Sequence, residues 1–166
     1  MFVSQHPNGP APGLRDKVPE IVIVAPSCDP FADFMRAAQA GEIGLHFCVN
    51  GHSALRLSRR FPAAAWIVAA DLPDMSGVDL VEMLAAHSLQ RIIDPPSAGT
   101  RSFLDQVSES LHAAVFIVSE GYRLADEQRA LAAGVAGFFV HPVTLDVIRD
   151  SLQHAAAGLG ADLLLG

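Results

Sequence analysis

The amino-acid sequence predicts an α/β protein built around a parallel sheet. Nearly unbroken apolar runs occur at residues 21–25, 66–69 and 115–119, as in strands that are covered on both faces. Between these runs, apolar residues recur every three to four positions, which is typical of amphipathic helices. The two patterns alternate five times, and this indicates a sheet wrapped by helices on both faces with right-handed crossovers.

The first strand, 21–25, leads into a helix whose start is marked by Asp29 and Pro30. We expect Asp29 to be the N-cap and Pro30 to take the first helical position. Gly41 should end this helix, because glycine readily adopts the backbone conformation that follows a last turn. The predicted buried face has helical spacing and consists of Phe31, Phe34, Met35 and Ala38.

Two further strands follow, at 45–49 and 66–69. Asn50-Gly51 is a turn signal between the second strand and a helix that runs to about residue 61. After the third strand, Pro73 can neither continue the strand nor sit inside a helix, so the chain must turn there. A helix is then expected at 78–87, behind a capping-box-like pair, Ser76 and Asp79.

A long connection, 88–113, separates the third helix from the fourth strand. Most connections in such units take only ~2–6 residues. Pro95-Pro96 ends whatever follows the third helix, and the spacing of apolar residues in 102–111 predicts an extra helix. We interpret the segment as a helical insertion, which either packs on the rim of the domain or binds a partner.

The last third of the chain contains two more strands. The fourth strand is 115–119, and the helix after it, 124–133, should end at Gly134. The fifth strand is 138–140, and Thr144 is expected to cap the final helix. The inward side chains of that helix should be Leu145, Ile148, Leu152 and Ala155.

Composition and charge exclude several classes of function. Among 166 residues, 51% are hydrophobic and 17% charged, as in a folded globular domain. The net charge is −7 and no basic stripe occurs, which argues against nucleic-acid binding. No run is apolar enough for a signal peptide or membrane span, so we expect a cytoplasmic protein with reduced Cys28 and Cys48. The predicted domain is 20–157, between a flexible leader, 1–19, and a tail or linker, 158–166.

Two motifs resemble those of response-regulator receiver domains, the CheY-like family. Residues 69–77, Ala-Ala-Asp-Leu-Pro-Asp-Met-Ser-Gly, resemble the family pattern Asp-x-x-Leu/Met-Pro-x-Met-(Ser/Asp)-Gly. Residues 130–142 look like the receiver segment Ala-x-x-Ala-Gly-Ala-x-Gly-(Phe/Tyr)-(Leu/Val)-x-Lys-Pro. The resemblance covers about residues 20–157, apart from the insertion. It implies a flavodoxin-like (βα)5 fold with strand order 2-1-3-4-5.

The resemblance also implies a phosphorylation pocket, and its residues are largely replaced here. In receivers an acidic pair holds Mg²⁺, an Asp accepts the phosphoryl group, a Thr or Ser contacts it and a Lys neutralises it. Counting back from Pro73 puts the phosphoacceptor position at Ala69. The positions of the acidic pair, the hydroxyl and the lysine hold, in order, Ala25, Pro26, Ser119 and His141.

These replacements predict a degenerate pocket without phosphotransfer chemistry. Alanine and proline side chains supply no metal ligand, and alanine cannot form an acyl phosphate. Asp71 and Asp74 are interpreted as turn acids that bind local amides, since a two-residue shift moves a group ~6–7 Å along a strand. Phe138 matches the aromatic residue that swings in receivers, and we expect it to stay buried in one conformation. His141 is expected to be a partly buried imidazole at the pocket mouth, or else a pH-sensitive contact.

The sequence therefore predicts a pseudo-receiver, a regulatory or protein-interaction module of bacterial two-component or phosphorelay signalling rather than an enzyme, with no cofactor and no metal site. The partner would be a regulatory or output protein, or a second copy, bound at the face formed by the fourth helix, fifth strand and fifth helix. The residues expected on that face are Arg123, Asp126, Glu127, Arg129, Arg149, Asp150 and Gln153. Two alternatives stay open: a small-ligand sensor using the crevice at Ala25, Pro26, Ala69, Ser119 and His141, and phosphorylation at a displaced Asp71.

Overall fold

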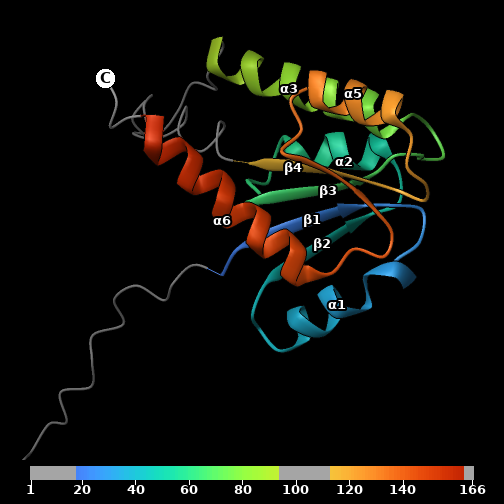
Figure 1. Cartoon of the computed structure of the whole chain (residues 1–166), viewed down its shortest axis with the longest axis vertical. Helices are drawn as coiled ribbons and strands as arrows, with labels where there is room; N and C mark the ends of the chain where they lie inside the picture. The colour runs from blue at the N-terminus through green and yellow to red at the C-terminus, as the bar shows by residue number, and fades with distance from the viewer. Residues whose placement is uncertain (1–17, 94–112, 163–166) are drawn as a thin grey trace, which may run out of the picture.

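Five parallel strands form one sheet with the order β2-β1-β3-β4-β5, as predicted (Figure 1). The computed structural model describes residues 18–93 and 113–162, and side chains within 18–87 and 113–154. The predicted helix at 102–111 lies outside this part, and the predicted domain boundaries remain predictions. No helix in the described ranges is long and apolar enough to cross a membrane. The strands are β1 Glu20–Val24, β2 Gly44–Cys48, β3 Ala65–Ala69, β4 Ala114–Ser119 and β5 Gly137–Val140.

Helices cover both faces of the sheet (Figure 1). α1 and α6 lie on one face, where their apolar side chains join a single buried cluster with β1, β3 and β4. α2, α3 and α5 lie on the other face and share two further clusters. The helical bounds are η1 Asp29–Phe31, α1 Ala32–Gln39, α2 Gly51–Ser58, α3 Gly77–Ile93, α5 Leu124–Ala132 and α6 Leu145–Asp162.

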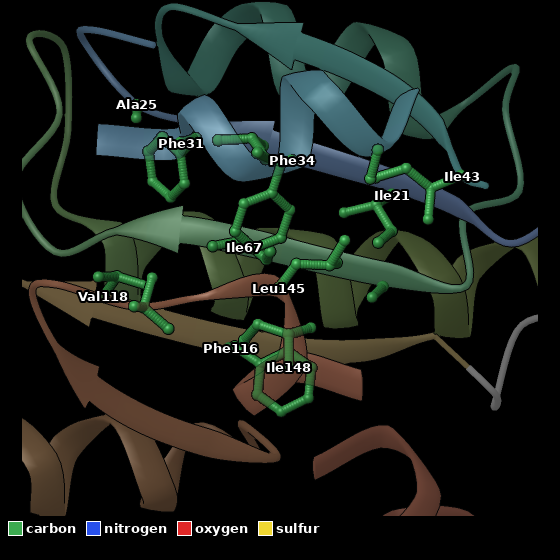
Figure 2. Close-up of a cluster of buried hydrophobic side chains, with 14 residues drawn as sticks. Ile21, Ala25, Phe31, Phe34, Ile43, Ile67, Phe116, Val118, Leu145 and Ile148 are labelled. Atoms are coloured by element: carbon green, nitrogen blue, oxygen red, sulfur yellow. The ribbon is translucent and has the colours of Figure 1, made fainter. Parts of the chain in front are cut away.

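The core is deepest at β1, β3 and β4, because helices cover both sides of these central strands. Ile67 of β3 and Phe116 of β4 are fully buried on the side of α1 and α6, and Phe34 of α1 and Ile148 of α6 meet them there (Figure 2). Burying a side chain of this size stabilises the fold by roughly 1.5–3 kcal/mol. The near-continuous apolar strands in the sequence are explained by this two-sided covering.

The first helix differs from its predicted form. Asp29 does not cap it, because Asp29 is itself the first residue of a short 3-10 helix, residues 29–31. Its carboxylate accepts a hydrogen bond from the Ser27 hydroxyl, 3.0 Å away. Met35 is 40% exposed, and Ala37 is buried in its place. Phe31, Phe34 and Ala38 remain on the buried side, so the predicted face was wrong only at Met35.

Helix ends elsewhere follow the predicted signals. Gly41 and Gly134 have φ values of 76° and 92°, a conformation that favours glycine. At the start of α6, the Thr144 hydroxyl accepts a bond from the Val147 amide, 3.4 Å away. The Asp33 carboxylate, from α1, accepts a bond of 2.7 Å from the Leu145 amide. This bond fixes α6 to α1 across 112 residues of sequence, and no local pattern predicts it.

The third helix is longer than predicted, running to Ile93 rather than ending at residue 87. Its start is as expected, with the Ser76 hydroxyl accepting a bond of 3.1 Å from the Asp79 amide. Asn50, predicted as part of a turn, is the N-cap of α2 and accepts a bond of 2.9 Å from the Ser53 amide. The predicted strands agree with the observed ones to within one residue at each end.

Candidate functional site: the carboxyl edge of the sheet

The carboxyl ends of β1, β3, β4 and β5 bring the predicted pocket residues to one edge of the sheet. Val24 of β1 lies beside Val68 of β3, so the following residues, Ala25 and Ala69, are level with each other. Ala69 lies beside Val118, and Ser119 beside Val140, so Ser119 and His141 follow at the same edge. The crevice at such an edge is where ligands bind in open α/β sheets.

The positions that would hold the acidic pair and the nucleophile carry only apolar side chains. Ala25 is 3% exposed and belongs to the buried cluster with Phe31. Pro26 is exposed, and Ala69 is half-buried and packs against the same cluster. Their side chains hold no oxygen that could ligate a cation or attack phosphorus. Within the described residues, no group of three His, Cys, Asp or Glu could hold a metal ion.

His141 and Ser119 are both engaged locally. The His141 ring lies edge-on to Phe31, with ring centroids 5.7 Å apart, and its side chain is 16% exposed. Its Nε2 is 3.9 Å from the Glu120 carboxylate, while its buried Nδ1 has no hydrogen-bond partner among the described residues. The Ser119 hydroxyl donates a bond of 2.9 Å to the Gly121 carbonyl. The His141 imidazole is therefore partly buried, and its role as a pH-sensitive contact stays a prediction.

The two acids after β3 have different environments. Asp71 is exposed, and its backbone pairs with Ser76 across the turn. Asp74 instead reaches α2, where its carboxylate accepts bonds of 2.9 and 3.0 Å from the Gly51 and His52 amides and also contacts the His52 ring. The Gly51 amide bond is the main cause that lowers the pKa of Asp74 to about 2. Asp74 was predicted to bind amides of its own turn, so the prediction was right about the bond type and wrong about the partners.

Close packing at Gly77 fixes the turn against the end of β3. A Cβ at this position would lie 2.3 Å from the Ala69 carbonyl oxygen. The Gly77 amide donates a bond of 2.8 Å to the carbonyl of Ala70. Only glycine allows this approach, so the Ser-Gly of the motif sets where α3 begins relative to the candidate site.

A groove of about 420 Å³ lies beside the pocket positions, between the ends of β3 and β4 and the start of α5. Ile117 and Phe138 supply apolar surface, and Asp71, Ser119, Arg123 and Arg129 supply polar groups. Of the five crevice residues named for ligand sensing, only Ser119 lines this groove. Periodicity did not point to the groove because its walls come from residues that are far apart in the chain.

Phe138 is only partly buried, contrary to the expectation that it stays buried. It packs against the cluster under α5 on one side and lies edge-on to the Tyr122 ring on the other, with centroids 6.5 Å apart. Strand β5 is at the edge of the sheet, so its side chains are less covered than those of β3 and β4. The Tyr122 hydroxyl donates a bond of 2.6 Å to Glu127, and this bond raises the pKa of Tyr122.

The residues predicted on the interaction face do not all share one surface. Arg123, the residue before α5, and Arg129, on α5, are exposed, and Arg129 lies 3.8 Å from Asp79 of α3. Arg149 points the other way, toward the turn between α1 and β2, where its guanidinium is 3.0 Å from the Glu42 carboxylate. This ion pair removes Arg149 from the predicted face. The others lie on α5 or α6 and are half-buried or exposed: Asp126, Glu127, Asp150 and Gln153.

Comparison with known proteins supports the fold. A Methanospirillum hungatei response-regulator receiver domain, described as CheY-like, is 16% identical, with a TM-score of 0.62 over 85% of this chain and 98% of that one. A Burkholderia pseudomallei response regulator with a phosphorylated aspartic acid is 15% identical, with a TM-score of 0.61 over 89% and 74%. The Saccharomyces cerevisiae Ssk1 receiver domain, solved with the phosphotransfer protein Ypd1, is 14% identical, with a TM-score of 0.62 over 81% and 86%.

No protein-family model and no curated protein matches the sequence. The chain has the fold of receiver domains, the signal-transduction modules of two-component systems.

Proposed function

We propose that this chain is a receiver-fold regulatory module that binds a protein partner and is not switched by aspartyl phosphorylation. The observation that carries the proposal is the carboxyl edge of the sheet, where Ala25, Pro26 and Ala69 occupy the positions of the metal-binding acids and the nucleophile. The module is proposed to have no catalytic activity of its own.

The chemistry of phosphoryl transfer supports this proposal. Transfer to a carboxylate needs a nucleophilic oxygen in line with the leaving group and cationic groups that neutralise the developing charge. An alanine methyl group provides neither, and a side chain of His141 packed on Phe31 replaces the flexible lysine. Ser119 remains, but its hydroxyl is bonded to the Gly121 carbonyl.

The partner surface is proposed to lie on α5 and the turn before it. Tyr122, Leu124 and Leu131 are 60%, 58% and 52% exposed. Leu124 and Leu131 are seven residues apart on α5 and so lie on one stripe of the helix. Charged residues of both signs, such as Arg123 and Asp126, flank this stripe, as at the rim of a protein interface. The yeast neighbour, a receiver solved in complex with a protein, shows that this fold can form such complexes.

The proposal is tested by treating the full chain with Mg²⁺ and phosphoramidate and measuring its intact mass. A conventional receiver domain serves as the positive control, and an Asp71→Asn variant is run beside the wild type. We expect no phosphorylated wild-type protein while the control is modified. Phosphorylation of the wild type that disappears in Asp71→Asn would overturn the proposal and establish a displaced acceptor.

The groove beside β4 supports a second candidate, a small-ligand sensor. Its volume of about 420 Å³ is within the range of metabolite pockets, and it combines an apolar floor with the guanidinium groups of Arg123 and Arg129. Screening mixtures of small carboxylates and phosphates by amide NMR tests this candidate. Saturable shifts at Ser119, Arg123 and Phe138 would support it, and their absence at millimolar ligand would count against it.

A further inference from the structure

We propose that the free edge of β2 pairs antiparallel with the β2 edge of a second copy, so that the two sheets become continuous across a two-fold axis. This surface is separate from the α5 surface of the proposed function. β2 is the first strand in the sheet order, and among the described strands only β1 pairs with it (Figure 1). Its outer side is therefore a row of main-chain groups without a strand partner.

The register identifies which residues face outward. The Gly44 amide donates to the Pro19 carbonyl, and the Cys48 carbonyl accepts from the Ala25 amide, both at 3.0 Å. In a parallel ladder, alternate residues bond to the same neighbouring strand. Since Gly44 and Cys48 bond to β1, the main-chain groups of Leu45, Phe47 and Val49 point to the free edge.

The side chains along this edge lack the features that usually prevent pairing. Edge strands are commonly protected by charged residues, prolines or bulges. β2 contains no Asp, Glu, Lys, Arg or Pro, and it keeps a regular register with β1 over its whole length. Phe47 and Val49 are 38% and 52% exposed, and Met35, also exposed, lies on α1, which packs against β2.

The lack of formal charge along the β2 edge favours a second copy as the occupant. With the two-fold axis at Phe47, each Phe47 faces its equivalent, and each Leu45 faces Val49 of the other copy, so every outward N–H meets a C=O. The net charge of −7 makes two copies repel at most surfaces. The β2 edge carries no formal charge of its own, and His46, on the other face of the strand, contacts Glu20 at 3.2 Å. Two copies can therefore meet here without bringing like charges together.

Light scattering after size-exclusion chromatography tests the proposal on the full chain, with Phe47→Lys as the main variant. Leu131→Lys is the matched control, since it places the same charge on the exposed stripe of α5. We expect dimers for the wild type and Leu131→Lys and at least a tenfold weaker dimer for Phe47→Lys. A dimer lost only in Leu131→Lys, or a wild type that is monomeric at high micromolar concentration, would overturn the β2 proposal. Neither result bears on phosphorylation, so the two proposals can fail separately.

A disulfide-crosslinking experiment tests the β2 proposal if Phe47→Lys does not fold. Residues that face each other in a hydrogen-bonded antiparallel pair have Cα atoms about 5.5 Å apart, within disulfide range. In a background with Cys28 and Cys48 replaced by serine, Phe47→Cys should form an intermolecular disulfide under mild oxidation at least tenfold faster than Leu131→Cys. Equal rates would overturn the proposal. Hydrogen exchange gives a second contradicting result. If the amides of Leu45, Phe47 and Val49 stay protected at any dilution and lose protection only when residues 1–17 are removed, the occupant of the β2 edge is residues 1–17 of the same chain and not a second copy.

Discussion

Gly77 packs closely against the backbone at the end of β3. A Cβ there would lie 2.3 Å from a backbone oxygen of Ala69, which cannot move aside as a flexible side chain could. We expect Gly77→Ala to reduce the free energy of unfolding by about 1–3 kcal/mol, the usual range for overpacking. Gly121→Ala is the matched control, because a Cβ added at Gly121 would meet nothing within 4 Å, and it should change stability by about 0.5 kcal/mol or less. Urea unfolding of both variants measures the difference, and equal midpoints would contradict this account.

At single residues, the sequence predicts what stands at each pocket position but not how each side chain is used. The spacing from Pro73 identified Ala69, and the sheet register agrees with its place at the end of β3. The contact of His141 with Phe31 could not be predicted, because it joins the end of β5 to the turn after β1. The partners of Asp74 were missed for the same reason, since Gly51 is 23 residues away in the chain.

At the scale of elements, Asp74 connects the turn after β3 to the N-terminus of α2. Its pKa falls from the ordinary 3.8 to about 2 because the Gly51 amide and other donors stabilise the ionised carboxylate. A lowered folded-state pKa means that the stabilisation is fully present above pH 3.8 and is lost as the pH falls toward 2. The negative charge is also favourable at a helix N-terminus.

Substitution of Asp74 by asparagine should therefore lower the midpoint temperature of thermal unfolding at neutral pH. The difference in midpoint temperature between variant and wild type should narrow as the pH falls from 3.8 toward 2. Thermal unfolding followed by circular dichroism between pH 7 and about pH 2 makes this comparison. Asp71→Asn, in the same turn but without bonds to α2, is the control and should behave like the wild type. If the difference in midpoint temperature between Asp74→Asn and the wild type were the same at all pH values, the charge of the Asp74 carboxylate would have no role in stability.

The order of elements was predictable because strand and helix patterns differ in period, whereas their ends and exposed faces depended on tertiary contacts. α1 illustrates the second case, since Met35 is exposed although its spacing placed it on the buried face, and Ala37 is buried. Arg149 also illustrates it, because its ion pair with Glu42 draws it away from the face on which the receiver resemblance placed it. Long-range partners of this kind leave no trace in local spacing.

At the scale of the whole molecule, the chain has the receiver arrangement of sheet and helices. We propose that the chemical groups of the phosphorylation pocket are replaced within this arrangement. A receiver switch couples phosphorylation at the carboxyl edge to the surface at α5 and β5. Here the edge has no acceptor at Ala69, yet Phe138 and the exposed stripe of α5 remain. The central claim of the proposed function is that this surface binds a partner without the switch.

An amide-resolved NMR titration of the full chain, first with Mg²⁺ and then with beryllofluoride as a phosphoryl mimic, tests this claim most directly. We predict no saturable shifts at Ala25, Ala69 or Ser119, because no carboxylate at these positions can hold the metal or the mimic. Saturable shifts centred on Asp71 and Ser119 would contradict the claim and place the protein among the phosphorylated switches.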